Sequence, residues 1–371
     1  MKQQVARVLI VGSGVGGATA AYALRRVGVD VHCIDIKPET PTAGSGICLL
    51  HNTLRALEMI DLVEPCLDIG MGFEVVRQFD SAGQSLHSSA VPASCGIRRP
   101  ELARILESAA TGAGALLEKG LTVESLVDRG DGVEVTFSDG REATYDLVIA
   151  SDGAYSNLRG QLFGPEVAPR FAGQSVWRFN APRPAQIDGF CLYRSPTGKT
   201  VGSFPTSQDS CYLFYLEKST EPLRIPGDQA HTLIRERLAE YTAPAVMESL
   251  EQVTDPSQVI FRPLEVTLVP APWHRGRVVL LGDAAHAPTP QMTSGGGMAI
   301  EDAVVLAECL IGAGSVEEAL MTYSQRRFER CKTIWDASLQ LCRYEQEDAI
   351  KNREKSTALL LKTYRYLEQP I

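Results

Sequence analysis

A glycine-rich turn near the start of the chain has the residue types and spacing that bind a dinucleotide. Gly12, Gly14 and Gly17 hold the key positions of a G-x-G-x-x-G pattern, with Val15 and Gly16 between them. The first glycine permits a tight turn, the second lets a pyrophosphate approach the backbone, and the third lets helix and strand pack closely. The pattern predicts dinucleotide binding; its alternative is an ordinary glycine turn between a strand and a helix.

An acidic side chain stands where a dinucleotide-binding fold needs one. Asp35 follows Gly17 by eighteen residues, at the end of an apolar run. A carboxylate in that place can accept a hydrogen bond from a ribose hydroxyl. We count Ile36 and Lys37, directly after it, among the cofactor-binding positions. The glycines and the acid together do not distinguish NAD from FAD.

The elements around these residues are those of a parallel, doubly wound sheet. Residues 5–11 and 29–35 are apolar, β-branched runs typical of buried strands, and residues 18–26 between them are rich in alanine and leucine, which favours a helix. A strand, turn, helix and strand in this order begin a Rossmann-like domain of the α/β class.

The rest of the chain adds an antiparallel sheet and long helices. From residue 168 to 216, aromatic and polar residues alternate between prolines, which predicts an inserted antiparallel sheet. We expect further strands at 132–137, 142–145, 146–150 and 277–281, and helices at 99–114, 231–241, 297–310 and 316–341, with more helix to 367. The sequence has no internal repeat and no low-complexity linker, so we expect interleaved domains.

Two further stretches resemble a known family. Residues 146–159 (DLVIASDGAYSNLR) are similar to the Asp-Gly segment of the flavoprotein aromatic hydroxylases, the p-hydroxybenzoate and salicylate hydroxylase group. Residues 282–303 (GDAAHAPTPQMTSGGGMAIEDA) are similar to their Gly-Asp segment. With the glycine turn, these segments stand in the family's order over about three hundred residues. The resemblance is to this group A family of FAD-dependent monooxygenases rather than to one member.

The resemblance implies non-covalently bound FAD and indicates residues around it. Asp283 would accept a hydrogen bond from a ribityl hydroxyl, and the helix that begins near residue 297 would present backbone N–H groups to the flavin. Arg99 matches an arginine that contacts FAD in relatives; its alternative is a solvated residue at a helix start. The other matched positions are Gly46, Asp152, Gly153, Gly282, Pro290, Gly295 and Gly296. For Gly46 a flexible loop is the alternative, and for Asp152 and Gly153 a turn that ends a strand.

Within the Gly-Asp segment one residue is ambiguous and one stretch departs from the family. Pro290 matches a proline whose peptide lies over the flavin near the carbon that reacts with oxygen. His286 could be catalytic, but we favour a structural role in which it packs and orients the turn. Many relatives have Gly-Gln-Gly where this chain has Thr293-Ser294-Gly295. The hydrogen bonding beside the pyrimidine edge of the flavin therefore cannot be carried over.

The resemblance also implies a reaction. NADH or NADPH would reduce the bound FAD, O2 would form a C4a-hydroperoxide, and its distal OH would be transferred to an activated aromatic or N-heteroaromatic small molecule. Because this attack needs an electron-rich ring, the protein must keep the substrate dry. The sequence has no second glycine fingerprint, so the nicotinamide cofactor would be a transient co-substrate.

The predicted elements and the resemblance together suggest a domain arrangement. An FAD-binding domain would comprise residues 1–70, 96–167 and 275–315. A substrate-binding β-sheet domain would comprise residues 71–95 and 168–274, and residues 316–371 would form a C-terminal helical region.

Side chains of the inserted sheet are the candidates for substrate binding. Tyr212 is the first of them, because a tyrosine at the matching place faces the pocket in some relatives, and Phe214 shares its face by the period of two. Arg178 could bind a carboxylate or phenolate, and His51 could border the flavin. The alternatives are a sheet packed into the core for the aromatics, a salt bridge for Arg178 and a helix-start position for His51. The sequence indicates no general base.

Composition excludes several classes of protein. With 36 Lys and Arg against 45 Asp and Glu, a net charge of -9 and no basic block, nucleic acid is not an expected partner. The nine cysteines are scattered without a C-x-x-C pair, which disfavours a disulfide framework and a metal site. The start does not resemble a signal peptide, and no apolar stretch approaches the roughly 20 residues that cross a bilayer.

We therefore expect a cytoplasmic protein without integral membrane association, whose partners are an aromatic substrate, O2 and NAD(P)H. The number of subunits stays open, because the helices from Val316 could close the core or meet a second copy in a homodimer.

Two rival functions remain. Another flavin oxidoreductase on the same fold, such as a halogenase, would carry a W-x-W-x-I-P motif, but Trp177, Trp273 and Trp335 are far apart. A non-catalytic dinucleotide-binding redox sensor would explain the glycine turn but not the two further segments.

Overall fold

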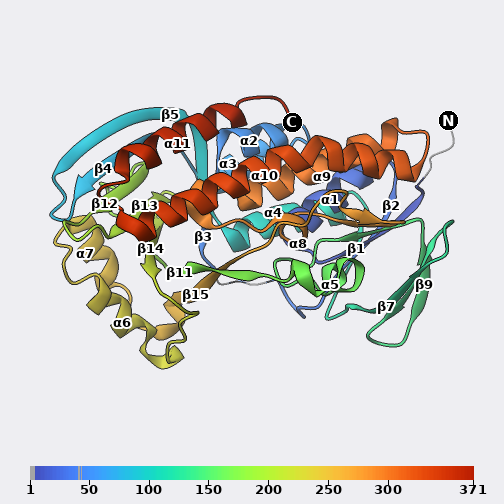
Figure 1. Ribbon diagram of the computed structural model, residues 1–371, viewed down its shortest axis with the longest axis horizontal. Coiled ribbons are helices and arrows are strands. Elements are labelled where there is room, and N and C mark those ends of the chain that lie inside the picture. Colours follow the sequence, from blue (N-terminus) through green and yellow to red (C-terminus); the bar gives the residue numbers. More distant parts are fainter. Residues whose placement is uncertain (1–4, 41, 43) are drawn as a thin grey trace.

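The computed structural model describes residues 5–40, 42 and 44–371, and within them two large sheets lie side by side with a long helix running over both (Figure 1). The helix is α10 (Val316–Asp348), which packs against one strand of each sheet. The mixed α/β class that the sequence predicts is confirmed.

The first sheet is the parallel, doubly wound sheet. Its order is β16-β17-β10-β1-β2-β6, and only the edge pair β16–β17 is antiparallel. The strands are β1 (Arg7–Val11), β2 (Asp30–Asp35), β6 (Leu116–Lys119), β10 (Leu147–Ala150), β16 (His274–Arg275) and β17 (Val278–Leu280). The central strands are buried on both faces, which is why their sequences are continuous apolar runs.

The second sheet is the larger one, with eight strands in the order β15-β11-β14-β13-β12-β4-β5-β3. They are β3 (Gly46–Leu49), β4 (Met71–Asp80), β5 (Ser85–Arg98), β11 (Arg170–Pro182), β12 (Phe190–Arg194), β13 (Thr200–Pro205), β14 (Ser210–Lys218) and β15 (Val259–Val266). β3 hydrogen-bonds into this sheet although residues 1–70 were expected in the FAD-binding domain.

The two faces of the larger sheet have different neighbours. Leu213 and Tyr215 belong to the apolar cluster under α6 (Ala230–Arg237) and α7 (Pro244–Glu251). Tyr212 and Phe214 belong to a separate aromatic cluster on the opposite face. The β11–β14 register sets Arg178 opposite Phe214. The alternation predicted for this strand is therefore confirmed.

A third, small sheet consists of β7 (Val123–Asp128), β8 (Val133–Phe137) and β9 (Glu142–Tyr145). β8 and β9 are the strands predicted at 132–137 and 142–145, whereas β7 was not predicted.

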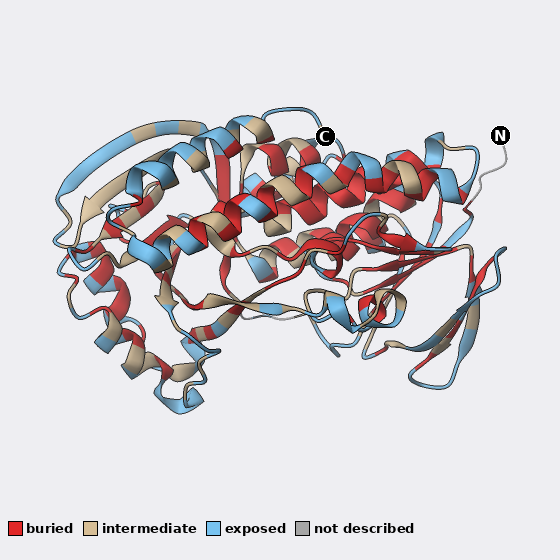
Figure 2. Cartoon of the chain, viewed as in Figure 1, coloured by how far each residue is buried: buried red, intermediate tan, exposed pale blue. Residues whose placement is uncertain are grey.

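The helices cover the first sheet and lie against both faces of the second, with α6 and α7 on one face and the end of α10 on the other. Besides α10 they are α1 (Val15–Arg26), α2 (His51–Glu58), α3 (Val63–Ile69), α4 (Arg99–Gly112), α5 (Asn157–Phe163), α6 (Ala230–Arg237), α7 (Pro244–Glu251), α8 (Asp283–His286), α9 (Gly295–Gly312) and α11 (Arg353–Leu367). Figure 2 shows α9 almost entirely buried between α1 and α10. None of the described helices is long and apolar enough to cross a bilayer. The nine cysteines are buried and unpaired.

Candidate functional site

The glycine turn at the end of β1 has two glycines enclosed by protein and one open to a ligand. A Cβ on Gly12, whose φ is +98°, would lie 2.4 Å from the backbone oxygen of Ser151, and one on Gly17 would lie 1.9 Å from the oxygen of Gly12. A Cβ on Gly14 would meet no protein atom within 4 Å. These are the three roles expected of a dinucleotide fingerprint, so the turn fits a pyrophosphate at Gly14.

The start of α1 completes this turn. Val15 is the first residue of the helix, and a Cβ on Gly16 would lie 2.6 Å from the side chain of Leu281. Gly16 thus lets α1 approach the strand that leads to the Gly-Asp segment.

Asp35 lies beside the glycine turn. Its carboxylate accepts hydrogen bonds from the backbone N–H and the hydroxyl of Ser13, at 2.9 and 3.0 Å, and from the backbone of Lys37. Ile36 and Lys37 are exposed. The position suits a ribose hydroxyl at the end of β2, as expected from the sequence.

Two charged residues next to Asp35 were missed by the sequence analysis. Glu107 on α4 and Lys119 on β6 form an ion pair of 2.5 Å, and both hydrogen-bond the hydroxyl of Ser13. Neither belongs to a motif. The only sequence signal is that Glu107 lies on a predicted helix; the strand that carries Lys119 was not predicted.

The three motif segments converge at one edge of the parallel sheet. Ser151 donates to the oxygen of Val11, and Leu281 donates to the oxygen of Ala150, both at 2.9 Å. Arg159 is 2% exposed and donates to the oxygen of Ala284 at 3.2 Å. Segments far apart in the sequence are thus brought together by backbone pairing and one buried arginine.

Asp152 and Gly153 form the turn after β10. Gly153 has a φ of +86°, and one carboxylate oxygen of Asp152 accepts weakly from the backbone of Leu158, at 3.3 Å. The other oxygen is buried without a partner among the described residues, and burial raises the pKa of Asp152. An unsatisfied buried acceptor at this turn fits a ligand that donates a hydrogen bond.

The Gly-Asp segment presents an open carboxylate and the start of a helix. Gly282, with a φ of +64°, is followed by Asp283 at the start of α8, and the side chain of Asp283 is exposed. Gly295 and Gly296 begin α9, so their backbone N–H groups are unsatisfied donors at the positive end of a helix dipole. This donor set fits the polar edge of a flavin. Thr293 is the first residue of the stretch that replaces the Gly-Gln-Gly of many relatives. It takes the left-handed conformation, with a φ of +54°.

His286 is part of a buried charge network behind this turn. Its Nε2 lies 2.6 Å from Asp302, and Arg327 donates to Asp302 and to Glu301, each at 2.7 Å. Arg330 also donates to Glu301, at 2.8 Å. The side chain of His286 is 2% exposed. The catalytic interpretation of His286 is therefore corrected, because its ring is enclosed by protein and already paired.

Mutual attraction determines the charge states in this network. Burial disfavours a charged imidazole, but the Cys331 sulfur and the Asp302 carboxylate raise the pKa of His286 well above its usual value. Burial likewise disfavours a carboxylate, yet charged His286 and Arg327 lower the pKa of Asp302 to about 2. His286, Asp302 and Cys331 place metal-ligand atoms within 4.8 Å of one another, but the guanidinium of Arg327 contacts two of them, which disfavours a cation.

The aromatic cluster on the other face of the larger sheet surrounds Tyr212. Its rings pack against each other, with Phe204 and Tyr212 at 5.0 Å and Tyr212 and Phe214 at 5.9 Å between centroids. Gly46 lies against Tyr212, since a Cβ there would come within 2.6 Å of it. Burial raises the pKa of Tyr212, while the guanidinium groups of Arg178 and Arg99 oppose that shift. The structure thus brings two predicted arginines to the predicted tyrosine.

Arg99, His51 and Pro290 are each the first residue of a helical element. Arg99 is exposed, yet partial desolvation of its guanidinium and the charge of Arg178 lower its pKa. His51 begins α2, with a buried Nε2 that has no partner among the described residues, and burial lowers its pKa. Pro290 begins a short 3-10 turn, residues 290–292. His51 has Arg55 and Glu368 as charged neighbours rather than Tyr212.

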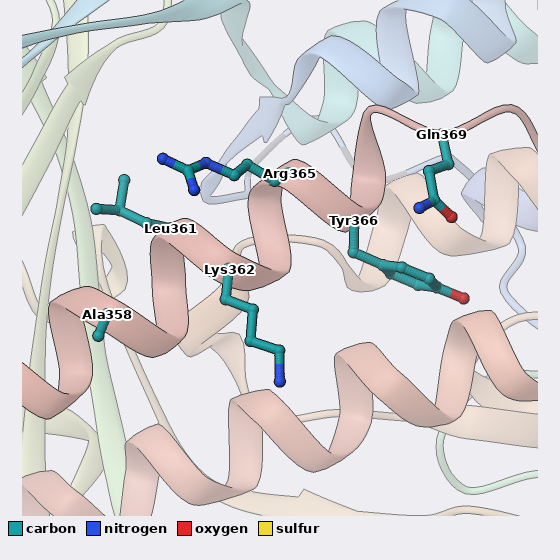
Figure 3. A pocket seen from close by; sticks show the side chains of 6 residues that line it. All are labelled: Ala358, Leu361, Lys362, Arg365, Tyr366 and Gln369. Carbon is teal, nitrogen blue, oxygen red and sulfur yellow. The ribbon is translucent and has the colours of Figure 1, made fainter.

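A surface pocket elsewhere contains none of the residues expected from the sequence. It lies along α11 and is lined by Ala358, Leu361, Lys362, Arg365, Tyr366 and Gln369 (Figure 3). Five of these side chains come from α11 and Gln369 follows that helix, and all six are remote in sequence from the three motifs.

Comparisons with known proteins match this geometry. Residues 5–338 match the protein-family model described as an FAD binding domain. Aurachin C monooxygenase/isomerase of Stigmatella aurantiaca is 32% identical over 362 residues, which cover 94% of this chain and 92% of that protein. The 6-hydroxynicotinate 3-monooxygenase of Pseudomonas fluorescens is 29% identical over 367 residues, covering 89% and 90%. A crystal structure of a Klebsiella pneumoniae HpxO variant complexed with FAD has a TM-score of 0.85 at 25% identity, covering 98% of this chain and 96% of that one.

Proposed function

Since the chain belongs to the FAD-binding-domain family of group A flavoprotein aromatic monooxygenases, we propose that it uses NAD(P)H and O2 to hydroxylate an activated aromatic or N-heteroaromatic small molecule. It would act as a single component, with NADH or NADPH as a transient co-substrate. One relative is named for 6-hydroxynicotinate, a substituted pyridine, which supports a ring of this class.

The observation that carries the proposal is the convergence of the three motif segments at one sheet edge, with Gly14 and Asp283 left open beside them. Bound FAD supplies electron transfer and the activation of O2. The proposal assigns its binding to the residues expected from the sequence: Gly12, Gly14, Val15, Gly16, Gly17, Asp35, Ile36, Lys37, Gly46, Arg99, Asp152, Gly153, Gly282, Asp283, Pro290, Gly295 and Gly296.

The substrate would lie against the aromatic face of the larger sheet. Tyr212 and Arg178 would bind a phenolate or carboxylate, because a buried hydroxyl and a guanidinium both donate to an anion. Phe214 would pack against the ring, and the peptide of Pro290 would cover the flavin. Aromatic walls exclude water, which strengthens these electrostatic contacts. His51 would border the flavin side.

The test is a panel of phenols, hydroxybenzoates, hydroxypyridines and quinolones given to the FAD-loaded enzyme with NADH or NADPH. We expect at least one compound to accelerate NAD(P)H oxidation and to yield a product one oxygen atom heavier by mass spectrometry. Peroxide without any hydroxylated product across the panel would favour another flavin oxidoreductase. A protein that takes up FAD but is never reduced by NAD(P)H would favour a redox sensor.

A further inference from the structure

A carboxylate that the sequence analysis did not select lies on the substrate face of the larger sheet. Glu345, near the end of α10, accepts hydrogen bonds from the side-chain amides of Gln174 on β11, at 3.1 Å, and of Gln291, at 3.0 Å. Gln291 also donates to Gln174 at 2.7 Å. Because Gln291 directly follows Pro290, Glu345 is linked to the loop expected beside the flavin.

Two acceptor atoms in this group have no donor. The amide oxygen of Gln291 is buried without a partner, and among the described residues one oxygen of Glu345 receives no hydrogen bond. Both atoms therefore suit a ligand that brings a hydrogen-bond donor.

Glu345 is exposed but has close neighbours. Partial desolvation of its carboxylate raises the pKa of Glu345. The amides of Gln291 and Gln174 and the charge of Arg194 on β12 only partly oppose this shift. Arg194 is itself engaged with Gln78, at 3.0 Å.

The distance from Glu345 to Arg178, the residue proposed to bind a substrate anion, follows from the strand that carries Gln174 and Arg178. Gln174 and Arg178 are four residues apart on β11, about 13 Å along a strand. An aromatic substrate held between Gln174 and Arg178 would meet the acceptor oxygens of Glu345 and Gln291 at one end. At its other end it would meet the guanidinium of Arg178.

We infer that Glu345, together with the free oxygen of Gln291, is the substrate's donor-recognition site, and that it accepts a hydrogen bond from a ring N–H or O–H of an N-heteroaromatic substrate. The inference rests on the proposed hydroxylase function and narrows its substrate class to rings that carry such a donor. Glu345 is a substrate-binding residue in this account.

The competing explanation is that Glu345 only clamps α10 onto β11 and the loop at residues 290–292. The variant Glu345→Gln separates the two. Its amide oxygen can still accept from the two glutamines, so the clamp survives, but its NH2 group replaces the acceptor that faces the ligand. Glu329→Gln, an exposed residue of the same helix, is the matched control.

The probes are 4-quinolone, which carries a ring N–H, and N-methyl-4-quinolone, which does not. Their dissociation constants are measured on FAD-loaded protein from the change in flavin absorbance, with the melting temperature measured alongside. We expect the wild type and Glu329→Gln to prefer 4-quinolone by roughly tenfold or more, as a hydrogen bond to a charged group allows. Glu345→Gln should lose that preference while keeping its FAD affinity and melting temperature.

Two outcomes would overturn the inference. If Glu345→Gln weakens both ligands equally or leaves the preference intact, Glu345 is a clamp. If the wild type binds both ligands alike, there is no donor recognition, even where both are hydroxylated. Failure of the proposed function is different: neither ligand would change the flavin spectrum or the rate of NAD(P)H oxidation, and no panel compound would gain an oxygen atom.

Discussion

Gly14 and Gly17 are both glycines of one short turn, yet their surroundings give them different roles. A side chain on Gly14 would enter empty space, whereas one on Gly17 would overlap the backbone of Gly12. We expect Gly14→Ala to keep the melting temperature within about 2 °C and to lose FAD, because the new methyl occupies the space of the pyrophosphate. Gly17→Ala should lower the melting temperature by several degrees, since overpacking costs about 1–3 kcal/mol. Calorimetry and flavin fluorescence measure both; equal FAD affinity of Gly14→Ala and wild type would contradict the account.

Asp283 is the carboxylate most open to a ligand, since it is exposed at the start of α8. We expect Asp283→Ala to weaken FAD binding by roughly tenfold to a hundredfold, the value of one hydrogen bond to a charged group. Titration of flavin-free protein by fluorescence quenching measures this. Asp68→Ala, an exposed carboxylate on α3, is the control and should bind FAD as the wild type does. Unchanged affinity in Asp283→Ala would remove Asp283 from the site.

Sequence reasoning at this scale succeeded where a residue belongs to a local pattern. Gly12, Gly14 and Gly17 could be placed because strand, turn and helix are adjacent in the chain. Glu345 and Gln291 could not be placed together, because they are 54 positions apart and meet only when α10 packs on the sheet. His286 lies in a motif, but only burial against Asp302 shows that it is structural.

Helices α9 and α10 are joined by buried charges. Arg327 on α10 pairs with Glu301 and Asp302 on α9, all three with no exposed side-chain surface. The sequence predicts both helices from their periodicity, but it does not indicate that Arg327 and Arg330 are buried. The two arginines are 0% and 4% exposed and neutralise the acids of the Gly-Asp segment.

The buried charges around Asp302 make the free energy of unfolding depend on pH in the acidic range. Burial opposes ionisation of Asp302, but charged His286 and Arg327 lower its pKa from 3.8 to about 2. A lowered carboxyl pKa stabilises the folded state above about pH 4, and the stabilisation is lost as the pH falls towards 2. We expect this group to contribute about 2 kcal/mol to that loss, measured as the free energy of unfolding in urea at a series of pH values.

The variant Asp302→Asn is the comparison for that series. At neutral pH it should be less stable by about 3–5 kcal/mol, because it leaves buried cations unpaired. Its stability should also vary less between pH 4 and 2. A slope identical to that of the wild type would show that Asp302 is not charged in the folded protein.

The place of β3 in the larger sheet is the element-scale feature that the sequence did not indicate. β3 pairs with β5 in the eight-stranded sheet, although it lies between segments of the glycine-turn domain. Pairing of this kind depends on contacts between distant segments, whereas periodicity reports only the local period of burial.

Across the whole molecule, α10 connects the two large sheets (Figure 1). FAD would bind where segments of both meet, because Gly46 comes from β3 and Gly14 follows β1. We therefore expect one unfolding transition by calorimetry, which shifts upward with FAD. At an FAD concentration of 100 times Kd, binding raises the free energy of unfolding by about 2.7 kcal/mol. Two transitions, of which FAD raises only one, would show that the sheets unfold independently.

The central claim is that the flavin of this chain inserts one atom of O2 into an aromatic ring. The most direct measurement is the mass of the product formed by FAD-loaded enzyme with NAD(P)H and the best panel substrate under 18O2, and again under 16O2 in H2(18)O. We predict that the heavy oxygen appears in the ring product only in the first experiment. Label taken up from water, or a product without added oxygen, would contradict the account.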